Sequence, residues 1–365
     1  MQMPLLKTLT IASILASTSS LVYGNSKELN VLNWSDYISP TTVDSFTQEL
    51  KIAVKYDTLD SDDTLQAKLL TGNSGYDVVY PSSTFMAKQL RAGVYEKLDW
   101  SKLPNRVNLD PELMLKVAQQ DPGNKYGVPY FWGTDGFVVN MTKAQAILGK
   151  NLPTQTWDLL YKPEWVSKLK SCGVSLVDSA TDVFPTMLAY MGKNPNSKDP
   201  NDYKAAFNEL KKIRPYITQF SSTYLNDVAG GDVCIAFAWS GDAGAIKSRV
   251  EETNRDYVIQ YFAPRHQTGL WFTLMGIPKD APNKESAYAW INYLMRPEVA
   301  ADITNQTTYP MGITLAKPLI DQQILADTNI YPTSDMLKDY FVFEPIEPEL
   351  LRLMNRLWVQ FKSGR

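Results

Sequence analysis

The sequence predicts an α/β protein of two lobes, in which each lobe is a mostly parallel sheet with flanking helices and a ligand cleft lies between them. Strand and helix signals alternate from about residue 29 to a helix that begins near residue 81. Short apolar runs then follow one another through Gly and Pro at residues 127–140, with no helix between them, and a second alternation begins near residue 143. The 365 residues suffice for two domains of ordinary size, and alternating strands and helices favour parallel sheets.

The first alternation is visible in the spacing of apolar residues and in the turn residues between the runs. Val43, Phe46 and Leu50 fall at i, i+3 and i+7, which gives the first helix a narrow apolar face. Polar residues 60–62 cap the second helix, and a segment from Gly72 to Gly75 ends it. Strands are expected at residues 29–32, 52–56 and 76–80, with helices at about 40–49, before residue 72 and from residue 81 onward.

The second half of the chain divides into a second lobe, a return to the first lobe and a helical tail. The second lobe is expected to hold strands 172–177 and 233–239 and a helix at about 183–191, while residues 257–262 and 270–277 return to the first sheet. Helices are expected at residues 284–295, 298–305 and 349–362. We therefore assign residues 25–133 plus 253–307 to lobe 1 and residues 134–252 plus 308–365 to lobe 2.

Composition and charge exclude several classes of protein. Hydrophobic residues make up 44% of the chain and charged residues 21%, which is typical of a globular protein. The net charge of −3, without a long run of either sign, argues against a nucleic-acid partner.

The N-terminal segment predicts export. Residues 1–24 have the pattern of a signal peptide, with Lys7 as the positive residue, a weakly apolar stretch at residues 9–21 and a cleavage point near Asn25. The apolar stretch is too short and too polar to span a bilayer, and no later stretch is apolar enough. We therefore expect a soluble protein in the periplasm.

Two cysteines and one histidine limit the chemistry that the chain can perform. In an exported protein, Cys172 and Cys234 favour a disulfide over a metal site or a nucleophile. His266 lies in a predicted surface loop, so a Cys–His pair or a histidine-based metal site has little support. We expect no cofactor and no metal.

The segment Asn33-Trp34-Ser35-Asp36-Tyr37 follows the first predicted strand. It puts an indole, a carboxylate and a phenol at the carboxyl end of that strand, the edge of an open α/β sheet where ligands bind. Aromatic faces attract an organic cation, and the carboxylate supplies a charge-assisted hydrogen bond. The alternative is a buried Trp and Tyr beside an Asp that caps the next helix.

These residues, together with four later motifs, resemble a known family. Residues 33–37, 76–82 (YDVVYPS), 128–132 (VPYFW), 170–174 (KSCGV) and 231–242 (GDVC through WSGD) stand in the order found in periplasmic polyamine-binding proteins of bacterial ABC importers, with the putrescine-binding branch most similar. The resemblance implies a type II periplasmic-binding-protein fold that closes on a diamine or polyamine. It also implies delivery to an inner-membrane ABC permease, and we expect a monomer.

The resemblance further implies a set of ligand-binding residues and a disulfide between Cys172 and Cys234. Asp182 matches an acidic contact that is usually Glu, Trp239 and Asp242 match a grip on an amine head, and Trp271 matches an aromatic wall. For Ser82 and Asp182, a helix cap is the alternative role. The implied ligand-binding positions are Trp34, Ser35, Asp36, Tyr37, Ser82, Asp182, Trp239, Asp242, Trp271 and Tyr309.

One position departs from the family pattern. Thr273 stands where putrescine-binding relatives have an acid, and a hydroxyl cannot neutralise an ammonium. We hypothesise that Asp135, at the predicted crossing between the lobes, faces the cleft and replaces the missing charge; the alternative is an exposed turn residue before Gly136. The departure leaves open a different polyamine, a ligand with one amine, or weaker binding.

Two other functions compete with transport. A ligand-sensing or signalling protein on the same fold, with altered amine specificity, is consistent with Thr273. An enzyme would need a nucleophile with a base, and neither the paired cysteines nor His266 provides one. The favoured function is therefore a non-catalytic binding protein.

Overall fold

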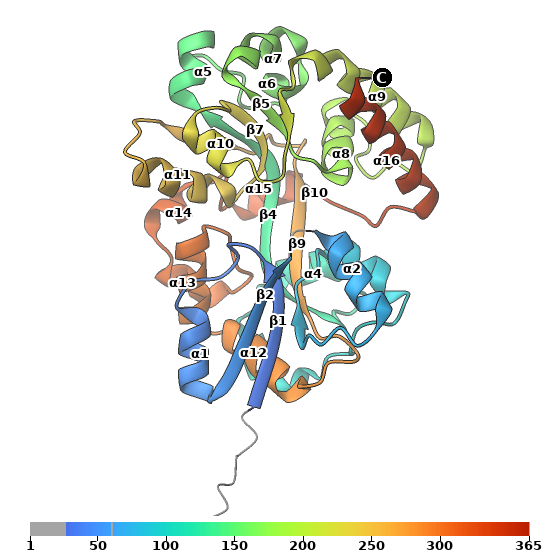
Figure 1. Ribbon diagram of the computed structural model, residues 1–365, viewed down its shortest axis with the longest axis vertical. Coiled ribbons are helices and arrows are strands. Elements are labelled where there is room, and N and C mark those ends of the chain that lie inside the picture. Colours follow the sequence, from blue (N-terminus) through green and yellow to red (C-terminus); the bar gives the residue numbers. More distant parts are fainter. Residues whose placement is uncertain (1–26, 60, 365) are drawn as a thin grey trace, which may run out of the picture.

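The computed structural model describes residues 27–59 and 61–364 and forms two lobes (Figure 1). We call lobe 1 the part that carries β1 (Lys27–Trp34), β2 (Ile52–Leu59) and β3 (Val78–Val79), and lobe 2 the part that carries β5 (Val174–Leu176), β6 (Gln219–Phe220) and β7 (Ile235–Trp239). The predicted signal peptide lies outside the described residues. Within those residues, no helix combines the length and the apolar character that a membrane span requires.

The three strands of lobe 1 run parallel in the order β2-β1-β3. Trp34 pairs with Leu59 and Leu32 pairs with Val79, so the carboxyl ends of all three strands meet at one edge of the sheet. The strands are followed by α1 (Thr42–Leu50), α2 (Asp62–Thr71) and α3 (Ser83–Leu90), which confirms the predicted alternation. On α1, Phe46 is fully buried and its ring centroid lies 4.9 Å from that of Trp290.

One long strand crosses from lobe 1 to lobe 2. β4 (Gly127–Asn140) is buried along its whole length and, with β9 (Gly269–Gly276), occupies the middle of the molecule (Figure 1). β4 pairs antiparallel with β9 over residues 127–134 and with β7 over residues 135–139. The absence of a helix in this stretch was predicted correctly, but the two separate apolar runs are one continuous strand.

The predicted return to the first sheet is right for one segment and wrong for the other. β9 pairs with β3 and with the lobe 1 part of β4. β8 (Ile259–Phe262) instead pairs with β4 at residues 137–140, in the sheet of lobe 2. Its apolar residues specify a buried strand without specifying the partner, and Tyr261 is buried opposite Val138. Our division of the chain between lobes remains a proposal, now with β8 in lobe 2.

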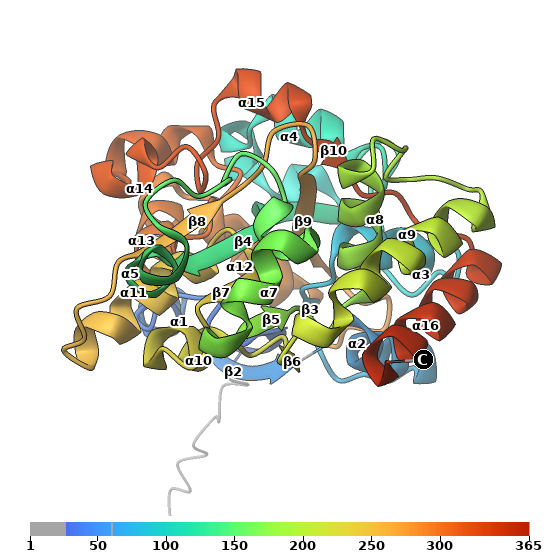
Figure 2. The ribbon, with the colours of Figure 1, turned by 90° about the horizontal axis from the view of Figure 1, so that it is seen from above.

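Both sheets are mixed, with parallel strands outside and antiparallel pairs at the centre. In lobe 2, β5 pairs parallel with β6 and β7, whereas β4 pairs antiparallel with β7 and β8. Helices α8 (Ala180–Tyr190), α9 (Pro200–Ile213) and α16 (Pro348–Ser363) lie side by side on lobe 2 (Figure 2). The Trp358 indole of α16 donates a 2.8 Å hydrogen bond to Asp178, which ties the tail to this lobe.

The segment before α16 pairs with strands and turns of lobe 1, although our division assigned residues 308–365 to lobe 2. Met311 and Ile313 form β-bridges with Phe131 and Leu109, and β10 (Phe341–Val342) pairs with β9.

The remaining helices are α4 (Pro111–Val117), α5 (Met141–Leu148), α6 (Asp158–Tyr161), α7 (Pro163–Leu169), α10 (Leu225–Gly230), α11 (Asp242–Glu252), α12 (Lys284–Leu294), α13 (Pro297–Thr307), α14 (Gln322–Ala326), α15 (Ser334–Asp339) and the 3₁₀ turns η1 (Trp100–Lys102), η2 (Pro104–Asn108), η3 (Lys170–Cys172), η4 (Arg214–Tyr216) and η5 (Thr314–Leu319).

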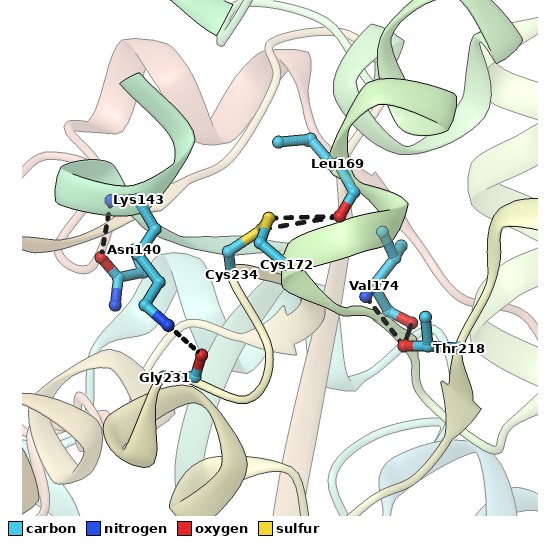
Figure 3. The surroundings of a disulfide bond; sticks show 8 residues. All are labelled: Asn140, Lys143, Leu169, Cys172, Val174, Thr218, Gly231 and Cys234. Atoms are coloured by element: carbon cyan, nitrogen blue, oxygen red, sulfur yellow. Dashed lines mark hydrogen bonds between the residues drawn. A yellow bond between two sulfur atoms is a disulfide. The ribbon is translucent and has the colours of Figure 1, made fainter. Parts of the chain in front are cut away.

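The predicted disulfide joins Cys172 to Cys234, whose Cα atoms are 5.6 Å apart, and it lies beside the Leu169 carbonyl (Figure 3). It links the end of η3 to the segment before β7. Gly173, which follows the bridge, has a φ of +91°, and a Cβ there would overlap the Asp232 carbonyl. A glycine is therefore required for β5 to pair with β7 at this point.

Candidate functional site

The turn after β1 is fixed to the ends of β2 and β3. The Trp34 indole donates a 2.8 Å hydrogen bond to the Tyr80 carbonyl at the end of β3. Asn33 donates to the Tyr56 hydroxyl at 2.8 Å, which secures the turn to β2. Asp36 adopts a φ of +58°, a left-handed conformation that Asp tolerates. The sequence prediction placed Trp34 and Tyr37 correctly at the carboxyl end of this strand.

Four aromatic rings meet where the lobes join, and we call them the aromatic box. Tyr37 lies 5.1 Å from Phe131 and 5.0 Å from Tyr309, measured between ring centroids. Tyr309 lies 5.4 Å from Phe131 and 5.6 Å from Trp271. The box combines the turn after β1, strands β4 and β9, and the segment after α13. Flat apolar faces of this kind suit a methylene chain and attract cations.

Asp242, the first residue of α11, contributes a buried carboxylate to the box. Its Oδ1 accepts a 2.5 Å hydrogen bond from the Tyr309 hydroxyl, and its Oδ2 accepts one from the Tyr224 hydroxyl. Burial raises the pKa of Asp242, while the two phenols oppose that shift. The N-terminus of α11 also favours a negative charge. The carboxylate is therefore held in place by neutral donors and can still accept a cation.

A second acidic group lies on the lobe 2 part of the crossing strand. Asp135 pairs across the sheet with Trp239 and is fully buried, and both its carboxylate oxygens lack a hydrogen-bond partner among the described residues. Burial raises the pKa of Asp135 well above its usual range, and the charge of Asp182 raises it further. Burial raises the pKa of Asp182, on α8, to about 6. Two carboxylates so placed favour a positively charged ligand.

The structure excludes the exposed-turn alternative for Asp135 because the residue is buried within β4. The electrostatic neighbour of its carboxyl group is Asp182, and Asp242 does not contribute to its pKa. The acids of lobe 2 thus form two separate groups. One is Asp242 with its phenols, and the other is Asp135 with Asp182.

Ser82 and Thr273 meet at the lobe 1 side of the cleft. They form an antiparallel β-bridge, and Thr273 is only 4% exposed. The Ser82 side chain does not cap α3, although the residue stands at the N-cap position. The Ser82 amide donates a 3.0 Å hydrogen bond to Oδ1 of Asp62, the first residue of α2. Sequence reasoning treated Asp62 only as part of a helix cap and missed its position at the edge where β1, β2 and β3 end.

Ser35 and Asp36 lie on the outside of the turn rather than in the box. Both are exposed, and the Asp36 side chain is 77% accessible. Its Oδ2 lies 3.5 Å from Nη2 of Arg249 on α11, so the pair links the two lobes at the surface. Trp239 is partly buried, and its backbone amide donates a 3.2 Å hydrogen bond to the Tyr224 hydroxyl.

The remaining chemistry of the described residues is limited. Cys172 and Cys234 are bridged, and His266 is an exposed loop residue, as predicted. Across residues 27–59 and 61–364, no group of three or more His, Cys, Asp or Glu side chains is arranged to hold a metal. What the cleft offers is indoles, phenols and carboxylates drawn from both lobes.

Two α/β lobes with aromatic and acidic side chains gathered where they meet are typical of a ligand-binding protein. The chain belongs to the family of bacterial extracellular solute-binding proteins, whose model matches residues 41–329. It is 45% identical over 361 residues to the putrescine-binding periplasmic protein SpuD of Pseudomonas aeruginosa, covering 98% of each chain. It is 41% identical to the putrescine-binding periplasmic protein PotF of Escherichia coli, covering 99% of this chain and 98% of that one.

Solved structures give the same family and fold. The spermidine/putrescine substrate-binding protein PotD of Streptococcus pneumoniae superposes with a TM-score of 0.79 at 31% identity, over 93% of this chain and 99% of that one. A spermidine/putrescine transporter protein of Listeria monocytogenes has a TM-score of 0.81 at 30% identity, over 93% of this chain and 100% of that one. The periplasmic-binding-protein fold and the family are thereby confirmed. The chain is an exported solute-binding protein and not an enzyme, as the sequence predicted.

Proposed function

We propose that the protein captures a polyamine between its lobes and delivers it to an inner-membrane ABC permease. The observation that supports this most is the aromatic box flanked by the buried carboxylates of Asp135 and Asp242, which form no ion pair among the described residues. Two relatives point in the same direction, because SpuD and PotF are putrescine-binding proteins. Putrescine or a related diamine is therefore the first ligand to test.

The chemistry of the cleft suits a flexible dication. An ammonium that leaves water must be paired and hydrogen-bonded, or its burial costs several kcal/mol. Asp242, fixed by Tyr224 and Tyr309, would receive one ammonium. Asp135, with Asp182 nearby, offers negative charge at a second place. The methylene chain between the ammonium groups would lie against the aromatic box.

The other predicted residues take supporting roles in this proposal. Trp34 and Trp239 extend the aromatic walls, while Ser82 and Thr273 line the lobe 1 side with neutral groups. Ser35 and Asp36 lie at the rim, where Asp36 would meet ligand only after leaving Arg249. These assignments rest on the geometry of the described residues and on the resemblance.

We further propose that the signal peptide is cleaved near residue 24, that the mature protein acts in the periplasm as a monomer, and that it binds no nucleic acid. The periplasmic location of SpuD and PotF supports the cleavage and the periplasmic site of action. The net charge of −3 supports the last.

The proposal is tested by calorimetric titration of the mature chain, freed of bound amines, with putrescine, cadaverine, agmatine, spermidine and spermine. We expect a dissociation constant of about 1 μM or lower for at least one of them, equivalent to about −8 kcal/mol. Asp242→Asn should weaken that binding by about tenfold or more, because a charged hydrogen bond is lost. If the wild-type chain binds none of the five amines, the proposed function is wrong.

A further inference from the structure

Asp62 stands at the sheet edge that carries the ligand-binding turn. β1 and β2 run parallel with Trp34 opposite Leu59, and β3 lies on the other side of β1 with Val79 opposite Leu32. Asp62 begins α2 shortly after β2 ends. Because neighbouring parallel strands end at one edge, the residues that follow β1, β2 and β3 lie together there.

The Asp62 carboxylate and Thr273 both contact Ser82. Its Oδ1 accepts the 3.0 Å hydrogen bond from the Ser82 amide, and Ser82 is bridged to Thr273 on β9. The Leu274 amide donates to the Pro81 carbonyl at 3.0 Å, which holds β9 against the segment after β3. Asp62 therefore lies next to the strand position where the resemblance implies an acid and this chain has Thr.

Helix capping does not account for this placement. Ser61 is the N-cap of α2, and its hydroxyl accepts a 3.2 Å hydrogen bond from the Thr64 amide. The Asp62 side chain turns instead toward Ser82. Asp63, exposed in the same first turn, already supplies a charge that favours the helix N-terminus.

Asp62 forms no ion pair among the described residues. Lys88 interacts with it electrostatically, but the Lys88 ammonium lies 4.4 Å from the ring centroid of Phe85. Burial raises the pKa of Asp62 to about 6, and the hydrogen bonds from Ser82 oppose that rise. That charge also raises the pKa of Tyr37, so the field of Asp62 reaches the aromatic box.

From these contacts we infer that Asp62 is a specificity-determining residue, whose carboxylate pairs with one ammonium of the polyamine from the lobe 1 side. This inference rests on the proposed function and deepens it. The acids of lobe 2 and Asp62 would then hold the ligand from opposite lobes. Their separation would determine which chain length fits.

The test is calorimetric titration of the wild type, Asp62→Asn, Asp63→Asn and the double variant Asp62→Asn/Thr273→Asp with the five amines named above. Asparagine retains an acceptor for the Ser82 amide and removes the charge. We expect Asp62→Asn to weaken the tightest amine by tenfold or more and Asp63→Asn to change it by less than threefold. Restoring an acid at residue 273 should recover most of the lost affinity, because the two positions are adjacent.

A structural role for Asp62 predicts a different pattern. In that case ligand-free Asp62→Asn would have a lower melting temperature than the wild type, and adding Thr273→Asp would not restore amine affinity. Binding by Asp62→Asn within threefold of the wild type overturns the inference while the proposed function stands. If the wild type binds no amine, the inference and the proposed function are both wrong. If Asp62→Asn does not fold, Asp62→Glu is tested instead, because it keeps the charge and moves it by one methylene. The ratio of putrescine affinity to cadaverine affinity should then change. An unchanged ratio also overturns the inference.

Discussion

At the residue scale, Asp242 shows how a buried carboxylate is kept ready for a cation. Its two oxygens accept hydrogen bonds from the neutral Tyr224 and Tyr309. The charge of Arg249, whose ion pair is with Asp36, opposes the rise in the pKa of Asp242. Tyr309 also packs its ring against Gly241, where a Cβ would overlap it. The phenol that holds the acid is thus itself held by the backbone before α11.

Removing the Tyr224 hydroxyl should destabilise the ligand-free protein. Tyr224→Phe leaves a buried carboxylate with one donor fewer, which should lower the free energy of unfolding by roughly 1.5–3 kcal/mol. Urea denaturation measures this change. Tyr126→Phe is the control, because the Tyr126 hydroxyl makes no hydrogen bond to the described residues; its effect should stay within about 0.5 kcal/mol. Equal effects of the two substitutions would contradict the role given to Tyr224.

The acids of the cleft predict opposite pH trends for stability and for binding. The pKa values of Asp62 and Asp182 are raised from 3.8 to about 6, so these groups bind protons more readily in the folded chain. Their contribution to the stability of the ligand-free protein is present at about pH 4 and is lost as the pH rises through about 6. Polyamine affinity should rise over the same range, because the charged carboxylates bind the cation.

Thermal unfolding without ligand and calorimetric titration with putrescine, both between pH 5 and pH 7.5, measure the two trends. Asp62→Asn should make both pH dependences, that of stability and that of putrescine affinity, less steep. Affinity that stays constant across this range would show that these carboxylates do not pair with the ligand.

At the element scale, β4 carries residues of both lobes on one strand, whose register against β9 shifts between Pro129 and Trp132. Phe131 belongs to the aromatic box and Asp135 to the second acidic group, and both sit on the same continuous strand. Its glycines allow close approach: Gly133 lies under the Trp271 indole, and Gly136 lies against Phe262 on β8. β4 therefore sets the distance between Phe131 in the aromatic box and the Asp135 carboxylate, and it also connects the lobes.

Replacing Gly136 with Ala should disrupt the pairing of β4 with β8. The added Cβ would overlap the Phe262 carbonyl, a backbone atom that cannot turn aside. We expect a loss of about 1–3 kcal/mol in the free energy of unfolding, measured by urea denaturation. Gly312→Ala is the matched control, since its nearest neighbour would be a Leu113 methyl at 3.4 Å. A cost no greater than that of the control would argue against the tight approach of β8.

At the scale of the whole molecule, the lobes contact each other through the box and through the surface pair of Asp36 with Arg249. The ion pair is exposed, with 77% and 30% of the two side chains accessible. Exposed pairs contribute about 0–1 kcal/mol because water and salt screen them. The arrangement of the lobes therefore depends on packing and on ligand contacts more than on this pair, and ligand can favour closure by contacting both lobes.

Arg249→Ala should accordingly change the free energy of unfolding by less than about 1 kcal/mol, with the difference shrinking at high salt. Denaturation at low and high ionic strength checks both points. A loss above about 2 kcal/mol that persists in high salt would mean that Arg249 acts through packing rather than through its charge.

The local pattern of the chain determined the alternation of strands and helices, the disulfide and the aromatic turn after β1, because these depend on spacing and composition near each residue. Motifs resembling a known family determined the fold, and the ligand-binding residues that they imply stay a prediction. Tertiary structure alone decided the rest. β8 pairs in lobe 2 because apolar alternation specifies burial and not a partner. Asp36 lies outside the box and Asp62 at the cleft edge because strand register, set by long-range packing, decides which polar residues face inward.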